Sequence, residues 1–117
     1  MPASSQTIIP STTHNGQNTD PVTITSDPYK GAGYFGFGFG LHTVSYQTTN
    51  FIGNIKIQAT LASTPSEEDW FDVGETIQDN EVATTASNIY SFTGNFVWIR
   101  ATFTYTAGTL NKISYNY

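Results

Sequence analysis

The sequence predicts an all-β protein, an antiparallel β-sandwich or jelly roll with an extended N-terminal arm. Of its 117 residues, 19 are Thr and 15% are Phe, Trp or Tyr, and β-branched and aromatic side chains suit the pleated surface of a strand. Short alternating segments recur between polar turns, and no stretch has a helical period. The length suits one domain of roughly 100 to 150 residues. We therefore expect an arm over residues 1–21 and a single sandwich domain over residues 22–117.

The N-terminal segment is polar, since Ser, Thr, Asn, Gln and Gly make up most of residues 2–21. Its large aliphatic side chains are Ile8 and Ile9, and two such side chains cannot bury enough surface to order the segment alone. Two interpretations remain open. The segment is a disordered terminus, or it is an arm whose Ile8 and Ile9 contact a neighbouring subunit.

Glycine alternates with aromatic residues in the stretch that follows a short strand expected over residues 22–25. In a strand, a period of two places the rings of Phe35, Phe37 and Phe39 on one face and nearly bare backbone on the other. The bare face indicates close packing within the domain. The sharper hypothesis is that this strand contacts another protein chain.

Residues 31–36 of the same stretch match the dinucleotide-binding fingerprint G-x-G-x-x-G. That fingerprint binds a pyrophosphate only where a helix follows it, and no helical period follows here. No cofactor is therefore expected.

The clearest strand pattern covers residues 54–62, where apolar and polar side chains alternate. Shorter strands are expected over residues 41–47, 70–73 and 87–92, and residues 75–86 are expected to be irregular or weakly extended. In the clearest strand, the side chains expected to point inward are Ile55, Ile57, Ala59 and Leu61, and those expected to point outward are Lys56, Gln58 and Thr60.

A long strand is expected over residues 96–105, with a turn at residues 106–108 and a final strand over residues 110–117. These two strands make a predicted β-hairpin. One face of the long strand carries Val97, Ile99, Ala101, Phe103 and Tyr105, and the other carries Phe96, Trp98, Arg100, Thr102 and Thr104.

The charge balance disfavours several classes of partner. The formal net charge is −5, and the basic residues are Lys30, Lys56, Arg100 and Lys112, so no basic face can neutralise phosphates. Nucleic acid and anionic membranes are therefore not expected partners.

The chain has no Cys and hence no disulfide or thiolate zinc site. Neither a signal-peptide pattern nor a membrane-spanning apolar run is found, so we expect a protein made in a cytoplasm and not secreted by the usual route.

Acidic residues crowd one predicted loop and the strand after it. Such a cluster can supply a carboxylate pair for glycoside cleavage or a calcium site, but its spacing is not that of an EF-hand, and a solvated loop is the favoured interpretation. His14 and His42 have no nearby ligand-forming residues. We expect no catalytic residue, no metal and no enzyme activity. The acidic residues are Glu67, Glu68, Asp69, Asp72 and Glu75.

Trp98 and Arg100 share a strand face with threonines, which is typical of an exposed surface that faces a partner. Large aromatic side chains and Arg are enriched at interface hot spots. An alternative is that Trp70, Trp98 and Tyr34 form a platform on which a sugar ring stacks.

Three segments resemble small virion structural proteins of tailed phages, particularly the T4-like phages of marine cyanobacteria. The segments are Phe51-Ile-Gly-Asn-Ile-Lys-Ile-Gln-Ala-Thr-Leu-Ala-Ser-Thr-Pro, Asp69-Trp-Phe-Asp-Val-Gly, and Phe92-Thr-Gly-Asn-Phe-Val-Trp-Ile-Arg-Ala-Thr with its continuation to Ile113-Ser-Tyr-Asn-Tyr. The resemblance covers residues 50–117 and implies a virion component. It carries over no catalytic residue and does not indicate a position in the particle.

The expected function is that of a non-enzymatic phage virion protein, either a capsid decoration or cement protein or a neck or tail accessory protein. Its expected partners are other virion proteins, such as the major capsid protein or neck and tail proteins, and further copies of itself. The candidate contact residues are Phe35, Phe37, Phe39, Trp98, Arg100, Ile8 and Ile9. The alternative is a glycan-binding module of a fibre or adhesin.

Overall fold

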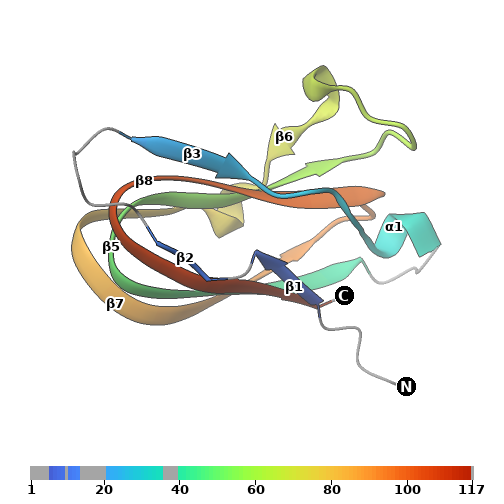
Figure 1. The fold of residues 1–117 in the computed structure, drawn as a ribbon. Helices are drawn as coiled ribbons and strands as arrows, with labels where there is room; N and C mark the ends of the chain where they lie inside the picture. Colours follow the sequence, from blue (N-terminus) through green and yellow to red (C-terminus); the bar gives the residue numbers. More distant parts are fainter. Residues whose placement is uncertain (1–5, 10, 14–20, 36–39, 117) are drawn as a thin grey trace.

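The computed structural model describes residues 6–9, 11–13, 21–35 and 40–116, and these residues form an antiparallel β-sandwich (Figure 1). One sheet runs in the order β1-β8-β5-β6, with β7 added beside β5 and with β2, β3 and β4 added beside β8. In that part of the chain, no helix is long and apolar enough to cross a membrane. The elements are β1 (Gln6–Ile9), β2 (Thr12–Thr13), β3 (Val22–Thr25), β4 (Tyr29–Lys30), α1 (Ala32–Phe35), β5 (Leu41–Thr60), η1 (Glu67–Asp69), β6 (Phe71–Asp72), η2 (Gly74–Thr76), β7 (Gln78–Thr93) and β8 (Trp98–Asn116).

Three long strands, β5, β7 and β8, bend together and pass from one layer of the sandwich to the other (Figure 1). Layer A contains the start of β5, the end of β7 and the end of β8, together with β1 and β2. Layer B contains the end of β5 and the start of β8, together with β3, β4 and β6. A single sheet therefore supplies both layers.

The bend depends on backbone conformations that most residues avoid. Asn50 has a φ of 49°, Gly53 of 155° and Gly108 of 90°. A Cβ atom at Gly108 would collide with the carbonyl oxygen of Asn50, so the bends of β5 and β8 are in direct backbone contact. The β5–β8 register shifts at the same place, between Thr49 and Gly53. Glycine is required where the two strands turn over each other.

The core lies between the layers. On β5 the buried positions are even-numbered in layer A and, except for the last residue Thr60, odd-numbered in layer B, because the bend inserts a shift in the side-chain alternation. The buried apolar side chains are Ile8, Ile9, Val44, Tyr46, Phe51, Ile55, Ile57, Ala59, Val73, Phe92, Ile99, Ala101, Phe103, Tyr105, Leu110, Ile113 and Tyr115.

The expected inward faces are confirmed for Ile55, Ile57 and Ala59, which are fully buried. Two positions of that pattern were wrong. Leu61 lies beyond the end of β5 and is 66% exposed. Thr60 was expected to face outward but is fully buried, and its hydroxyl accepts a hydrogen bond from the backbone N–H of Ala62 at 3.1 Å.

The hairpin predicted for the end of the chain was wrong, because β8 continues through residues 106–108 as one bent strand. Its first half pairs with the second half of β5, and its second half pairs with the first half of β5. A hairpin would have placed Phe103 and Ile113 on the same side of one layer. The bend places them in different layers, and both are buried in the one core between the layers.

Ile8 and Ile9 lie in the core of their own chain, each 4% exposed. The described parts of the expected arm, β1 and β2, pair antiparallel with β8. The register of β1 shifts between Thr7 and Ile9, and such a bulge lets two consecutive side chains face the same side. Ile8 and Ile9 are therefore corrected from partner contacts to core residues.

The strand predicted for the glycine-aromatic stretch was also wrong where the structure describes it. Residues 32–35 form the helical turn α1, so Phe35 is not part of an alternating strand; Phe37 and Phe39 lie outside the described residues. The backbone N–H groups of Gly31 and Gly33 donate to the carbonyl oxygens of Val97 and Phe96, each at 2.9 Å. A Cβ at Gly33 would collide with backbone atoms there. These glycines permit close approach to the chain just before β8.

Candidate binding site

Trp98 and Arg100 point outward from layer B, because their neighbours Ile99 and Ala101 are fully buried on the inner side. Adjacent strands bring further polar and aromatic groups to the same outer surface. The outward side chains beside them in the register of β4, β5 and β6 are Lys30, Gln58 and Asp72, whereas Thr60, which pairs with Trp98, is buried.

The guanidinium of Arg100 is held by several partners at once. Its two terminal nitrogens donate to both carboxylate oxygens of Glu67, at 3.1 and 3.2 Å, and its Nε donates to Oε1 of Gln58 at 2.9 Å. It lies 4.4 Å from the centre of the Trp70 ring, within the range of a cation–π contact. The Arg100 side chain is only 12% exposed. Arg100 thus fixes Trp70 and the η1 loop against the sheet.

Trp98 is fixed in a similar way. Its indole N–H donates to the carbonyl oxygen of Ser63 at 3.0 Å. The ring of Tyr34 meets the ring of Trp98 in an edge-on arrangement with centres 5.2 Å apart, and the ammonium of Lys30 lies 4.6 Å from the centre of the Tyr34 ring. Tyr34 is 46% exposed. We call Tyr34, Trp70, Trp98 and Arg100 the aromatic–arginine face.

The structure brings together residues that sequence reasoning assigned to two separate hypotheses. Trp98 and Arg100 were expected to meet a protein partner, and Trp70, Trp98 and Tyr34 to meet a sugar. They occupy one surface of layer B. The residues that hold this surface in place, Gln58, Ser63 and Glu67, were not identified as such. The alternation of β5 had placed Gln58 outward, but its pairing with Arg100 depends on the strand register.

The acidic residues near this face have structural partners. Glu67 binds Arg100, and the hydrogen bonds from Arg100 lower the pKa of its carboxyl group. Asp72 accepts hydrogen bonds from Gln58 at 3.0 Å and from Lys56 at 3.1 Å, and these bonds lower its pKa. Asp69 accepts from the backbone N–H of Ser66 at 2.8 Å. A carboxyl group with a lowered pKa stays ionised near neutral pH, so Glu67 and Asp72 are poor general acids.

His42 is part of the core. It is fully buried, its ring stacks on that of Phe92 with centres 4.9 Å apart, and its Nδ1 lies 2.8 Å from the carbonyl oxygen of Gly40. Desolvation lowers its pKa. The other histidine, His14, lies outside the described residues. Within the described ranges, no group of three or more His, Cys, Asp or Glu side chains could hold a metal ion.

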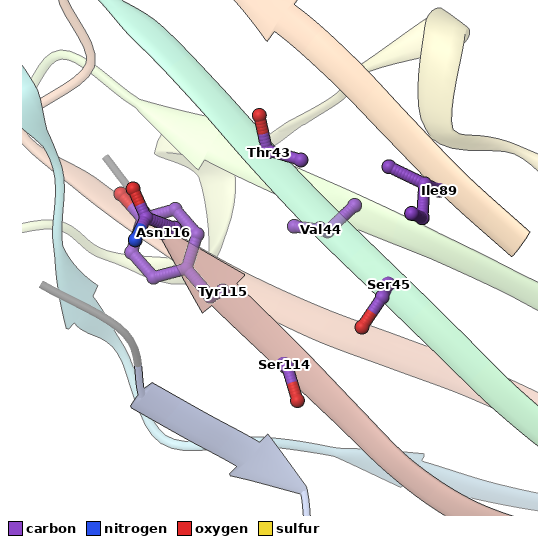
Figure 2. A pocket seen from close by; sticks show the side chains of 7 residues that line it. All are labelled: Thr43, Val44, Ser45, Ile89, Ser114, Tyr115 and Asn116. Carbon is purple, nitrogen blue, oxygen red and sulfur yellow. The ribbon is translucent and has the colours of Figure 1, made fainter. Parts of the chain in front are cut away.

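The outer face of layer A has a different character. A shallow hollow of about 190 Å³ lies there, and three of its seven lining residues carry small hydroxyl side chains beside the exposed Ile89 (Figure 2). A second hollow, of about 410 Å³, lies at the bend and includes Asn54, Asp79 and Glu81. The residues of the first hollow come from β5, β7 and β8, and are Thr43, Val44, Ser45, Ile89, Ser114, Tyr115 and Asn116.

No protein-family model and no curated protein sequence matches the chain. Among solved structures, the chain is similar to one from infectious bursal disease virus, Gx strain, with a TM-score of 0.49 and 12% identity over 99% of this chain and 32% of the viral chain. It is similar to a family 29 carbohydrate-binding module from Piromyces equi, with a TM-score of 0.48 and 10% identity over 100% of this chain and 93% of the module. A family 6 carbohydrate-binding module from Zobellia galactanivorans gives a TM-score of 0.38 and 14% identity over 80% and 72% of the two chains. These likenesses concern the fold alone.

Proposed function

We propose that the chain is a non-enzymatic structural protein of a tailed-phage particle, where it binds another particle protein through the aromatic–arginine face. The observation that carries the binding role is the ordered cluster of Tyr34, Trp70, Trp98 and Arg100 on the outer surface of layer B. The particle assignment, as a capsid decoration or a neck or tail accessory protein, rests on the resemblance of residues 50–117 to phage virion proteins. Made in a host cytoplasm, the protein would then be carried in the virion.

The geometry of the face suits protein recognition for an entropic reason. A side chain that is already held in one conformation loses little freedom when a partner covers it. Trp98 is held by Ser63 and Tyr34, and Trp70 by Arg100. Because Arg100 is mostly covered already, its role is to position Trp70, while Tyr34, Trp70 and Trp98 make the contacts. Large, rigid aromatic side chains of this kind dominate interface hot spots.

The acidic residues support a non-catalytic role. Glu67, Asp69 and Asp72 are engaged with Arg100, Ser66 and the Lys56–Gln58 pair. Each carboxylate therefore has a structural task that explains its place in the η1–β6 region. None of the three is required for chemistry to account for the local structure.

The test is to count copies of the chain in phage particles purified by density gradient, using quantitative mass spectrometry. We expect wild-type chains to purify with the particles and Trp98→Ala chains to be strongly depleted from them. Val82→Ala is the matched control, because Val82 is an apolar side chain, 71% exposed, outside the face. Wild-type protein missing from particles would overturn the particle assignment. Equal incorporation of the two variants would overturn the choice of face.

One observation favours glycan binding as a second candidate function. The rings of Trp70, Trp98 and Tyr34 lie beside polar side chains on an open sheet surface, an arrangement on which a sugar ring can stack. Against it, Arg100 already lies over the Trp70 ring. A glycan array probed with the purified chain tests this candidate, and a specific signal lost in Trp70→Ala and kept in Val82→Ala would support it. The absence of any signal would remove it.

A further inference from the structure

Strand β7 presents a long, regular edge in layer A. From Ala86 to Thr93 it pairs with β5 residue by residue, and the register shifts of the β5–β7 ladder lie outside this stretch. Among the described strands, β5 is its only pairing partner. The side of β7 away from β5 is therefore an open edge with backbone groups free to pair.

This edge lacks the features by which sheet edges usually avoid other strands. Residues 86–93 read Ala-Ser-Asn-Ile-Tyr-Ser-Phe-Thr and contain no charged residue, no proline and no glycine, and the ladder has no register shift there. Proteins protect open edges with inward-pointing charges, prolines, bulges or covering segments. Ile89, in the middle of the regular stretch, is 72% exposed. The exposed isoleucine and the uncharged edge mark a pairing surface.

Hydrogen bonding indicates which backbone groups point outward. The N–H of Gly94 donates to the carbonyl oxygen of Gly40 at 3.0 Å, just beyond the end of the ladder. Backbone groups alternate in direction along a strand, so the even-numbered residues point toward β5. The N–H and C=O groups of Ser87, Ile89 and Ser91 then point away from β5. These are the groups that a new strand would meet.

We propose that β7 pairs with β7 of a second copy of this chain, antiparallel across a two-fold axis, with Ile89 opposite the Ile89 of the partner subunit. A two-fold axis perpendicular to the sheet reverses the strand direction, so the two copies of β7 pair antiparallel. In this register Ser87 meets Ser91 of the partner subunit, and the two Ile89 side chains cover each other. The sheet of layer A then continues from one copy into the next.

The charge distribution allows two copies of an acidic protein to meet here. Although the net charge is −5, the regular edge from Ala86 to Thr93 is uncharged. Ile89 lies opposite Ser45 of β5, which lies opposite Ser114 of β8, so the row of side chains across the sheet from Ile89 is also uncharged. The carboxylates of Glu67 and Asp72, each in an ion pair with a basic side chain, belong to the η1–β6 region beside layer B. The proposed interface is separate from the aromatic–arginine face and goes beyond the proposed function without resting on it.

Light scattering of the purified full chain tests the stoichiometry. We expect a mass twice the 12.8 kDa of one chain for the wild type, and a mass halved to that of one chain for Ile89→Lys. Ser114→Lys is the matched control, because it adds the same charge to the same row, two strands away from the edge, and it should leave the dimer intact. Ser91→Lys is a second edge variant, and circular dichroism checks that all variants are folded. A monomeric wild type, or a dimer that survives both edge variants, would overturn the proposal.

Amide hydrogen exchange then distinguishes edge pairing from contact through a face. In the wild-type dimer, the amides of Ser87, Ile89 and Ser91 should be protected like those of Asn88 and Tyr90, which bond to β5. In folded, monomeric Ile89→Lys, only the odd-numbered amides should exchange faster. Unchanged exchange at these amides when the dimer dissociates would contradict pairing along the edge.

Discussion

The two outer faces of the sandwich are built from the same strands yet differ in chemistry. On layer B, β5 and β8 present Gln58, Trp98 and Arg100, which are linked to Trp70 and Glu67. On layer A, the same two strands present the hydroxyl groups of Thr43, Ser45 and Ser114 around a shallow hollow that no charged residue lines. The bend at residues 49–53 and 106–108 separates the two. One continuous strand can therefore carry two unrelated surfaces if its backbone passes from one layer to the other.

This difference underlies our proposal of two kinds of contact in two regions. The rigid, partly charged aromatic–arginine face suits recognition of a different protein. The uncharged margin of layer A, formed by β7, suits pairing with a copy of itself. The predictions that follow change the bend, the core between the layers and the ion pair beside the face, in that order of expected effect.

Gly108→Ala should have the largest effect, because it attacks the bend that separates the faces. At a φ of 90°, a Cβ is strained, and it would also collide with the backbone of Asn50. Strain and overlap of this kind each cost roughly 1–3 kcal/mol, so we expect a loss of about 4 kcal/mol in the free energy of unfolding, measured in urea. Gly74→Ala is the control, since no atom lies within 4 Å of a Cβ there. Equal stability of the two variants would show that the bend does not need glycine.

His42→Phe should change how stability depends on pH. Burial lowers the pKa of His42 in the folded protein, whereas in the unfolded chain it titrates near 6.5. Below pH 6.5, the unfolded chain binds a proton that the folded protein does not, so the free energy of unfolding falls until the pH reaches the lowered pKa of the folded state. Unfolding in urea at a series of pH values should show this fall in the wild type.

In His42→Phe the fall just below pH 6.5 should be weaker, while the ring stack on Phe92 keeps an aromatic partner. The region above pH 6.5 serves as the internal reference, because His42 is neutral there in both states. The same slope in both proteins would mean that another group is responsible.

Lys56→Ala should have the smallest effect. The ammonium of Lys56 lies 3.1 Å from the Asp72 carboxylate, but the two side chains are 31% and 43% exposed. Ion pairs this exposed contribute less than about 1 kcal/mol, and salt screens them. We expect a small loss of stability that shrinks in high salt, and no loss for Lys112→Ala, which removes an exposed lysine of β8. A large loss that persists in high salt would show that the pair is more strongly coupled to the fold than its exposure indicates.

Several features of the fold could be predicted because they depend only on local alternation. The burial of Ile55, Ile57 and Ala59 follows from a period of two, as does that of Ile99 and Phe103. The burial of short apolar segments could not be predicted in this way. Ile8 and Ile9 are adjacent, which no regular strand pattern would place on one side, and the bulge in β1 that does so has no sequence signal.

The candidate site was predicted in part for the same reason. The outward direction of Trp98 and Arg100 is a local property of one strand, and the sequence shows it. The contact of Arg100 with Glu67 and Gln58 joins residues 33 and 42 positions apart, and no pattern in the chain identifies those pairs. The sequence indicates a change of chain direction at residues 106–108. It does not indicate whether the segments on either side pair with each other or lie in different layers.

The amino-acid sequence by itself determined the all-β class and the buried side of residues 55–59 and 99–105, because side-chain alternation is a local consequence of strand geometry. It also determined the low content of basic residues and the absence of cysteine, and with them the absence of a basic face, of disulfides and of thiolate zinc sites. Only the tertiary structure decided that β5 and β8 bend into both layers, that Ile8 and Ile9 close the core, and that Trp70 and Glu67 meet Arg100. Those outcomes depend on pairing and packing between distant segments, which the burial of one shared core selects.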